Sequence, residues 1–196
     1  MVKSCAVLLL CSMVIAMSMV QGIDESPQAV AKWFTNLPKM KEKRLLRSPA
    51  YSNNFYFYDQ VSGKNATAVK VAQANTTSQS PNLFGLVGVI DDALKTGPEP
   101  GSKIVGRAQG MYYSAGLEEA VAVMNVNLVF TSREYNGSTL SLSGRNPYLH
   151  PYREMPIVGG SGFFRLARGI ATAKTYVYNS TTGDAIVEYN VIVIHY

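Results

Sequence analysis

The sequence predicts an all-β protein, an eight-stranded antiparallel β-barrel. Downstream of Asn54, short runs rich in β-branched and aromatic residues are separated by clusters of Gly, Pro, Asn and Ser, which is typical of strands joined by tight turns. No stretch of about 11 residues in this region keeps its apolar residues at helical spacing. We favour a barrel over an open sandwich because closing a sheet removes its unpaired edges.

The chain divides into three expected parts. Residues 1–22 have the features of a secretory signal peptide, namely Lys3 near the start, the apolar run Ala6–Val20 and a small-residue cleavage site. The run is too short for a membrane span, which needs about 20 apolar residues. Residues 23–53 form an N-terminal segment. Residues 54–196 form the barrel domain, because 196 residues with 47% apolar content suffice for one core.

Composition excludes several classes of function. Cys5 and Cys11 leave with the signal, so the mature protein has no disulfide, no thiol nucleophile and no cysteine-based metal site. His150 and His195 are far apart and have no acidic cluster at ligand spacing, so we predict no metal and no cofactor. The net charge of +5 is spread along the chain apart from Lys39–Arg47, which predicts a solvated segment rather than a nucleic-acid interface.

Four N-x-S/T sequons follow the signal peptide, and all of them lie in turn-rich stretches. A single sequon is a weak motif, but four in a secreted chain indicate an extracellular glycoprotein whose sequon loops face solvent. The acceptor asparagines are Asn65, Asn75, Asn136 and Asn179.

The elements follow one another in a regular order. The segment Ser26–Met40 is mixed in character and predicts a docking segment or one helical turn. The expected strands are Phe55–Asp59, Thr67–Ala74, Phe84–Ile90, Ile104–Ser114, Ala120–Phe130, Ser138–Ser143, Met155–Val158, Phe163–Val177 and Ala185–His195. Polar loops lie at Asn75–Asn82 and Lys95–Gly101. Asn136-Gly137 predicts a type I′ hairpin turn, and Thr182-Gly183-Asp184 predicts another turn.

Three glycines, Gly159, Gly160 and Gly162, interrupt the apolar segment Ile157–Ala171. The last two begin a G-x-G-x-x-G pattern, but Arg165 occupies the position of the third glycine and no helical spacing follows. We therefore predict a tight connection between two strands here and no dinucleotide site.

Alternation along Ile104–Tyr113 places Gly106, Ala108, Gly110 and Tyr112 on one face. If this face points inward, its small residues leave a hollow beside the Tyr112 phenol, and a barrel of eight strands can hold one small ligand. The alternative is that large residues from other strands fill the space, or that the glycines form bulges. The sequence leaves both possibilities open.

Two charged residues are candidates for such a hollow. Asp59 shares a face with Phe55 and Phe57, and a carboxylate on an aromatic wall has reason to shift its pKa and act as acid, base or hydrogen-bond acceptor. The alternative is an exposed aspartate at a strand end. Arg153 follows a rigid loop with two prolines and three aromatic rings, where it can clamp a phenolate or stack on an aryl ring. The alternative is a surface arginine.

Several segments of the chain resemble plant dirigent proteins. They are V-G-G-S-G-F-F-R-L-A-R-G-I-A at 158–171, Ile104–Tyr113, Ile90-Asp91-Asp92 and Asp184–Val191, within a resemblance that covers roughly Trp33–Tyr196. The resemblance implies an eight-stranded barrel of the dirigent and allene-oxide-cyclase type that assembles into a homodimer or homotrimer. The motifs S-G-R-N-P and D-A-I-V-E-Y-N-V are closer to the branch that contains pterocarpan synthases.

The resemblance also implies roles for individual residues. It places Asp59, Tyr112, Asn146 and Arg153 in the pocket. We expect Asp59, Tyr112 and Arg153 to be catalytic, and Asn146, Phe57 and Tyr113 to bind substrate. Two positions depart from the lignan-forming members. Asn146 stands where they have an aspartate, and an amide cannot take up a proton as a carboxylate does. Tyr58 stands where a histidine is usual.

Three functions are open to a protein of this kind. Dirigent proteins hold phenoxy radicals of monolignols such as coniferyl alcohol and set the stereochemistry of their coupling to lignans in phenylpropanoid metabolism. A separate laccase or peroxidase performs the oxidation. The first alternative is a lyase or cyclase of the pterocarpan-synthase type, which closes an isoflavanol through a quinone methide with Asp59 as the acid. The second is a binding or wall-structural protein without turnover. In each case we expect secretion to the apoplast or cell wall.

Overall fold

The computed structural model describes residues 26–35, 53–131 and 135–195. The expected signal peptide and the basic cluster Lys39–Arg47 lie outside these residues. In chain order the elements are α2 (Pro27–Thr35), β1 (Asn53–Asp59), β2 (Ala68–Ala72), η1 (Thr77–Gln79), β3 (Val87–Lys95), β4 (Ile104–Ser114), β5 (Ala122–Phe130), β6 (Thr139–Asn146), β7 (Arg153–Ser161), η3 (Gly162–Phe164), β8 (Arg168–Tyr178) and β9 (Ala185–Ile194).

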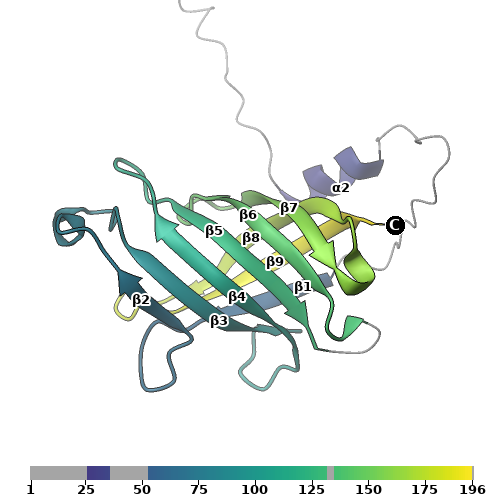
Figure 1. Cartoon of the computed structure of the whole chain (residues 1–196), viewed down its shortest axis with the longest axis horizontal. Coiled ribbons are helices and arrows are strands. Elements are labelled where there is room, and N and C mark those ends of the chain that lie inside the picture. Colours follow the sequence, from purple (N-terminus) through teal and green to yellow (C-terminus); the bar gives the residue numbers. More distant parts are fainter. Residues whose placement is uncertain (1–25, 36–52, 132–134, 196) are drawn as a thin grey trace, which may run out of the picture.

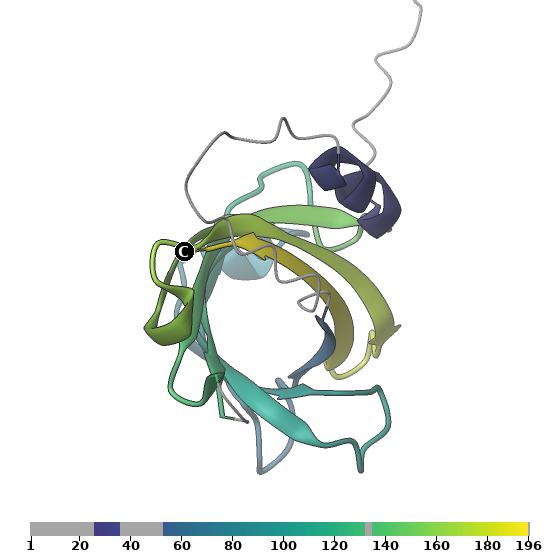
Figure 2. The ribbon, with the colours of Figure 1, turned by 90° about the vertical axis from the view of Figure 1, so that its right-hand side faces the viewer.

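The strands form a closed antiparallel barrel, as the sequence predicts. Hydrogen-bonded neighbours follow the order β1-β9-β8-β7-β6-β5-β4-β3, and a further pairing between β1 and β3 closes the ring of eight strands. The remaining strand, β2, pairs with the first half of β3, whereas β1 pairs with its last three residues. Figure 1 shows the strands crossing the molecule obliquely, and Figure 2 looks into the ring.

Alternation along each strand divides the residues between the interior and the outer surface. On β5 the side chains of Val126 and Leu128 are buried, whereas those of Asn125 and Asn127, which alternate with them along the strand, are exposed. The predicted face of β4 with Gly106, Ala108, Gly110 and Tyr112 points inward, because Gly106 and Ala108 are buried and the intervening residues are more exposed. The apolar core therefore lies inside the barrel.

Three expected details differ from the structure. β3 does not end at Ile90 but continues to Lys95, because its last residues pair with β4 on one side and with β1 on the other. Gly159 and Gly160 belong to β7, and the connection to β8 is a 3-10 turn that starts at Gly162 (φ 61°). Strand β8 consequently begins at Arg168, five residues later than expected.

The Asn136-Gly137 turn is also different from the prediction. A type I′ turn needs φ above zero at both central residues, and of the two only Gly137 has it, at 79°. The loop is held by the Gly137 N–H, which donates to the Phe130 carbonyl at 2.9 Å. It is therefore longer than a two-residue hairpin.

Helix α2 lies outside the barrel wall, as Figure 2 shows. Ser26 precedes it and its hydroxyl accepts a hydrogen bond from the Ala29 N–H at 3.2 Å, which satisfies one donor of the first turn. Val30 is buried, so the helix is docked on the protein through at least this residue. Among the described residues, no helix combines the length and apolar character needed to cross a bilayer.

The interior packing predicts the effect of a core truncation. Replacing the fully buried Leu128 by alanine should lower the free energy of unfolding by about 2–5 kcal/mol, through lost burial and a cavity. The neighbouring exposed Asn127→Ala should cost about 1 kcal/mol or less. Urea unfolding of both variants checks the expectation, and equal losses would contradict the assigned faces.

Candidate functional site

The closing pair of strands brings two carboxyl groups together inside the barrel. In the antiparallel β1–β3 ladder, Tyr58 is the partner of Ala93. The next residues along the two strands are Asp59 and Asp92, and both continue the inward faces that begin with the buried Phe57 and Leu94. Two acidic side chains from distant parts of the sequence therefore lie beside each other.

Asp92 is the more deeply buried of the two and has no exposed surface. The hydroxyl of Thr67, which leads into β2, donates a short hydrogen bond to Asp92 Oδ1, while Oδ2 is buried without a partner in the described part of the chain. Burial, with a smaller contribution from the charge of Asp59, raises the pKa of Asp92 to about 8. The Asp92 carboxyl is therefore mostly protonated at neutral pH.

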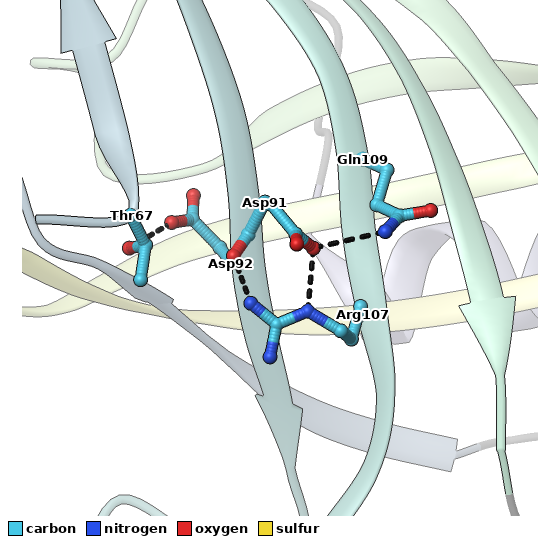
Figure 3. A network of polar contacts seen from close by, with 5 residues as sticks. All are labelled: Thr67, Asp91, Asp92, Arg107 and Gln109. Atoms are coloured by element: carbon cyan, nitrogen blue, oxygen red, sulfur yellow. Dashed lines mark hydrogen bonds and ion pairs between the residues drawn. The ribbon is translucent and has the colours of Figure 1, made fainter. Parts of the chain in front are cut away.

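Its neighbour Asp91 has the opposite environment, which Figure 3 makes plain. Asp91 is exposed on the outer face of β3, where Arg107 Nε donates to its Oδ1 at 2.5 Å and Gln109 Nε2 donates to the same oxygen at 3.1 Å. The hydrogen bond from Arg107 holds the pKa of Asp91 below its ordinary value. Of these two adjacent aspartates on β3, Asp91 thus has a lowered pKa and Asp92 a raised one.

Asp59 is also perturbed, but less strongly than Asp92. Burial, and then the charge of Asp184, raises the pKa of Asp59 to about 6, so this carboxyl is mostly ionised at neutral pH. Its Oδ1 is buried and has no hydrogen-bond partner among the described residues. An unpaired buried carboxyl oxygen is costly and is typical of a functional position.

The Tyr112 phenol belongs to the same cluster. Burial and the nearby charges of Asp59 and Asp92 raise the pKa of Tyr112 to about 12, so the phenol stays protonated. Its ring covers Gly88 on the neighbouring strand, where an added Cβ would lie 2.5 Å from Tyr112 Cζ. Glycine at position 88 therefore provides the space that the Tyr112 ring occupies.

Tyr189 on β9 connects this cluster to the opposite wall. Its ring is buried and stacks on Phe57 with centroids 5.4 Å apart. Burial raises the pKa of Tyr189 to about 12, while the charges of Arg153 on one side and of Asp59 and Asp92 on the other act on it in opposite directions. The aromatic wall thus lies within electrostatic range of both charged groups.

Arg153 is a buried cation held by neutral partners. Its Nε donates to Asn146 Oδ1 at 3.2 Å, and its Nη1 donates to Thr175 Oγ1 at 2.9 Å and to the His150 carbonyl at 3.4 Å. Burial lowers the pKa of Arg153, yet a guanidinium remains charged at neutral pH. A buried cation without a paired carboxylate attracts negative charge that develops near it, as on a phenolate oxygen.

The structure brings together most of the expected site residues. Asp59, Tyr112 and Arg153 lie on the interior, and so do Asn146 and Phe57. Tyr113 is a correction: it follows Tyr112 on β4, so its side chain lies on the outer face and is 36% exposed.

Sequence reasoning missed Asp92, Tyr189 and Thr175. Asp92 shares its face with the buried Ile90, so alternation would have found it once the strand was extended past that residue. The four sequon asparagines, Asn65, Asn75, Asn136 and Asn179, are all exposed. Within the described ranges, His, Cys, Asp and Glu side chains form no group of three suited to a metal ion.

The chain is similar to proteins of one kind in sequence and in structure. Residues 52–194 match the family model described as "Dirigent-like protein". Dirigent protein 23 of Arabidopsis thaliana is 53% identical over 141 residues, which cover 72% of this chain and 75% of that protein. Pterocarpan synthase 1 of Glycyrrhiza echinata is 49% identical over 144 residues, covering 73% and 77%. A solved pterocarpan synthase dirigent protein superimposes with a TM-score of 0.69 at 49% identity, covering 73% of this chain and 83% of that one.

The raised pKa of Asp92 predicts a pH-dependent stability. The folded protein keeps a proton that the unfolded chain releases near pH 4, so Asp92 makes the fold less stable as pH rises from about 4 to about 8. Asp92→Asn keeps an acceptor for Thr67 and carries no titrating proton. Urea unfolding should therefore show this variant to be more stable than the native protein by about 2 kcal/mol or more at pH 8, with the difference shrinking toward pH 4.5.

The adjacent Asp91→Asn is the matched control. The pKa of Asp91 is lowered, so its contribution to stability is present above the unfolded pKa and is lost as pH falls. This variant should be equal to or less stable than the native protein at pH 8. A constant stability difference for Asp92→Asn across the whole pH range would contradict the assigned protonation state.

The neutral partner of Arg153 predicts a second effect. Asn146→Asp places a carboxylate where Nε of Arg153 now donates to an amide, so the cation becomes paired and attracts a bound phenolate less. Affinity for 4-nitrophenolate, followed by absorbance, should fall about tenfold or more. Asn125→Asp makes the same charge change on the outer face and should leave affinity unchanged; equal losses would mean that net charge, not Arg153, governs binding.

Proposed function

Because the chain belongs to the dirigent-like protein family, we propose that it catalyses the dehydrating ring closure of an isoflavanol through a quinone methide, as a pterocarpan-synthase-type lyase. The observation that carries this proposal is the pair of interior carboxyls, one protonated and one ionised at neutral pH. Two titrating groups with separated pKa values suit paired acid and base roles. The similarity to pterocarpan synthases supports the same activity.

The reaction uses the two carboxyls in complementary roles. Asp92, as the acid, gives its proton to the benzylic hydroxyl, and the carbon–oxygen bond breaks to release water. The electron pair of that bond leaves with the water. Asp59, as the base, removes the proton of the conjugated phenol, and the electron pair of its O–H bond moves into the ring system to form the quinone methide. A second phenol of the substrate then adds to the benzylic carbon. Its proton goes to the quinone methide oxygen, and the proton that Asp59 took up passes to Asp92, so both carboxyls are reset and the net change is loss of one water. Sequence reasoning gave the acid role to Asp59; the higher pKa of Asp92 favours the exchange.

The other interior groups stabilise the charge that moves during these steps. Arg153 is positioned to attract phenolate character on the substrate oxygen, because its own partners are neutral. The phenol of Tyr112 stays protonated and serves as a hydrogen-bond donor beside the two carboxyls. The stacked rings of Phe57 and Tyr189 provide an apolar wall for an aryl ligand.

A second candidate function is the stereoselective coupling of phenoxy radicals, such as those of coniferyl alcohol, to lignans. The aromatic wall and the similarity to proteins named dirigent protein favour it. In that case a laccase or peroxidase makes the radicals and this protein only orients them. A product ratio of 10:1 requires about 1.4 kcal/mol between two orientations, which a few aryl contacts supply.

The proposal also covers the setting in which the protein works. We place it outside the cell, as a glycoprotein with sugars on its exposed sequons and assembled as a homodimer or homotrimer. An apolar row of Val69, Val89 and Met111 runs across β2, β3 and β4 on the outer surface, which suits such an assembly.

Two incubations separate the candidate functions. Purified protein is first mixed with a 7,2′-dihydroxyisoflavan-4-ol without any oxidant, and the pterocarpan enantiomers are resolved by chiral chromatography. In the second incubation, coniferyl alcohol is oxidised by a laccase with and without the protein. Ring closure in the first supports the lyase. Racemic lignans with enantioselective ring closure exclude the coupling role for that substrate, and the reverse outcome excludes the lyase.

The lyase proposal predicts a bell-shaped pH profile. Activity should rise as Asp59 ionises near pH 6 and fall as Asp92 loses its proton near pH 8. Asp92→Asn should lower kcat about 100-fold or more, the usual worth of a general acid, whereas the outward Asp91→Asn should not. A flat profile between pH 5 and 9 would contradict the two-carboxyl mechanism.

A further inference from the structure

A second polar pocket lies on the outside of the barrel, away from the carboxyl pair. It has a volume of about 160 Å³ between the start of α2 and the outer faces of β1, β8 and β9. Figure 2 shows the helix resting on this side of the ring. Drug-sized ligands occupy about 300–1,000 Å³, so this pocket admits a molecule of one ring.

Thr172 on β8 marks the floor of this pocket. Its neighbours Ala171 and Ala173 are buried inside the barrel, so alternation points Thr172 outward. Even so, Thr172 is only 2% exposed, and its hydroxyl has no hydrogen-bond partner among the described residues. A buried hydroxyl without a partner costs about 1–3 kcal/mol, and a ligand group in the pocket would satisfy it.

The rest of the lining offers donors and acceptors side by side. Asn190 Nδ2 donates to Asn54 Oδ1 at 2.7 Å, and Asn54 Nδ2 donates to Glu188 Oε1 at 3.2 Å, so three strand residues form a chain that ends on a carboxylate. Lys174 is the cross-strand neighbour of Glu188 in the β8–β9 ladder. Its ammonium lies 5.9 Å from the centroid of the Tyr152 ring, which also lines the pocket.

This mixture of groups limits the kind of ligand. The Glu188 carboxylate repels an anion, and the Lys174 ammonium repels a cation. An apolar molecule would leave the Thr172 hydroxyl without a partner and would cover the charged groups of Lys174 and Glu188. A neutral ligand with several hydroxyls fits, because each hydroxyl both donates and accepts, and the Tyr152 ring can cover the C–H face of a sugar ring.

We propose that the pocket between α2 and the outer faces of β1, β8 and β9 binds one neutral sugar ring. The Thr172 hydroxyl, the Glu188 carboxylate and the amides of Asn54 and Asn190 contact its hydroxyls. The proposal does not depend on the chemistry inside the barrel, because Thr172, Lys174 and Glu188 lie on the outer face of the wall.

The test uses the full mature protein and saturation-transfer NMR with four probes. These are methyl β-glucopyranoside, methyl α-mannopyranoside, sodium glucuronate and sodium sulfate. At least one neutral glycoside should bind with a dissociation constant of about 1 mM, and the two anions should bind at least tenfold more weakly. No binding of either neutral glycoside, or preference for the anions, would overturn the proposal.

Two variants place the binding in this pocket. Thr172→Val replaces the unpartnered hydroxyl by a methyl group, and Glu188→Gln removes the carboxylate. Each should weaken glycoside binding at least tenfold, while Thr96→Val at an exposed position should not. Thr172→Val should also unfold at the same or a higher temperature than the native protein, which separates lost binding from lost structure. Native-like glycoside affinity in both pocket variants would refute the site.

Discussion

The pairing of β1 with the last residues of β3 is the interaction on which the rest of this structure depends. It closes the row of strands into a ring, so β1, which would otherwise be an edge strand, has hydrogen-bonded partners on both sides. The same few hydrogen bonds fix the register in which Asp59 faces Asp92. A shift of one residue on either strand would turn one of these carboxyls to the outer surface, because side chains alternate between the two faces. The β1–β3 pairing therefore both closes the barrel and sets the relative positions of the two carboxyls.

The interior is organised as two charged regions with an aromatic wall between them. The carboxyl pair lies on β1 and β3, and Arg153 lies at the start of β7, with Tyr189 within electrostatic range of both. Asp92 and Arg153 have almost no exposed surface, so each charge acts more strongly than it would at the surface. The arrangement suits the proposed chemistry, in which proton transfer and phenolate stabilisation are assigned to separate groups of the interior. It also explains why neutral partners surround the guanidinium: a carboxylate there would cancel its attraction for the ligand.

Local sequence patterns were enough to predict the barrel and part of the site, and the reasons for success and failure are physical. The face of β4 with Gly106 and Tyr112 follows from alternation alone, which needs no knowledge of partner strands. Asp92 was missed because the adjacent Asp91-Asp92 resembles a solvated strand end. Pairing with β4 on one side and with β1, more than 30 residues away in the sequence, on the other extends the strand past it. The Asn136-Gly137 turn was mispredicted although β5 ends at Phe130, as expected, and β6 begins within one residue of the expected start, because the backbone of Asn136 does not adopt the positive φ that a type I′ turn needs. Residue type and spacing predict faces well, but they do not predict where a strand ends when a distant partner decides it.

The place of Thr67 has a consequence for how the barrel can be tuned. This residue leads into β2, the one strand of the sheet that is not part of the closed ring, and its hydrogen bond lowers the proton affinity of Asp92. The segment around β2 can vary in sequence while the closed ring of eight strands stays intact. The proton affinity of a carboxyl inside the ring can therefore be changed through a residue that lies outside it.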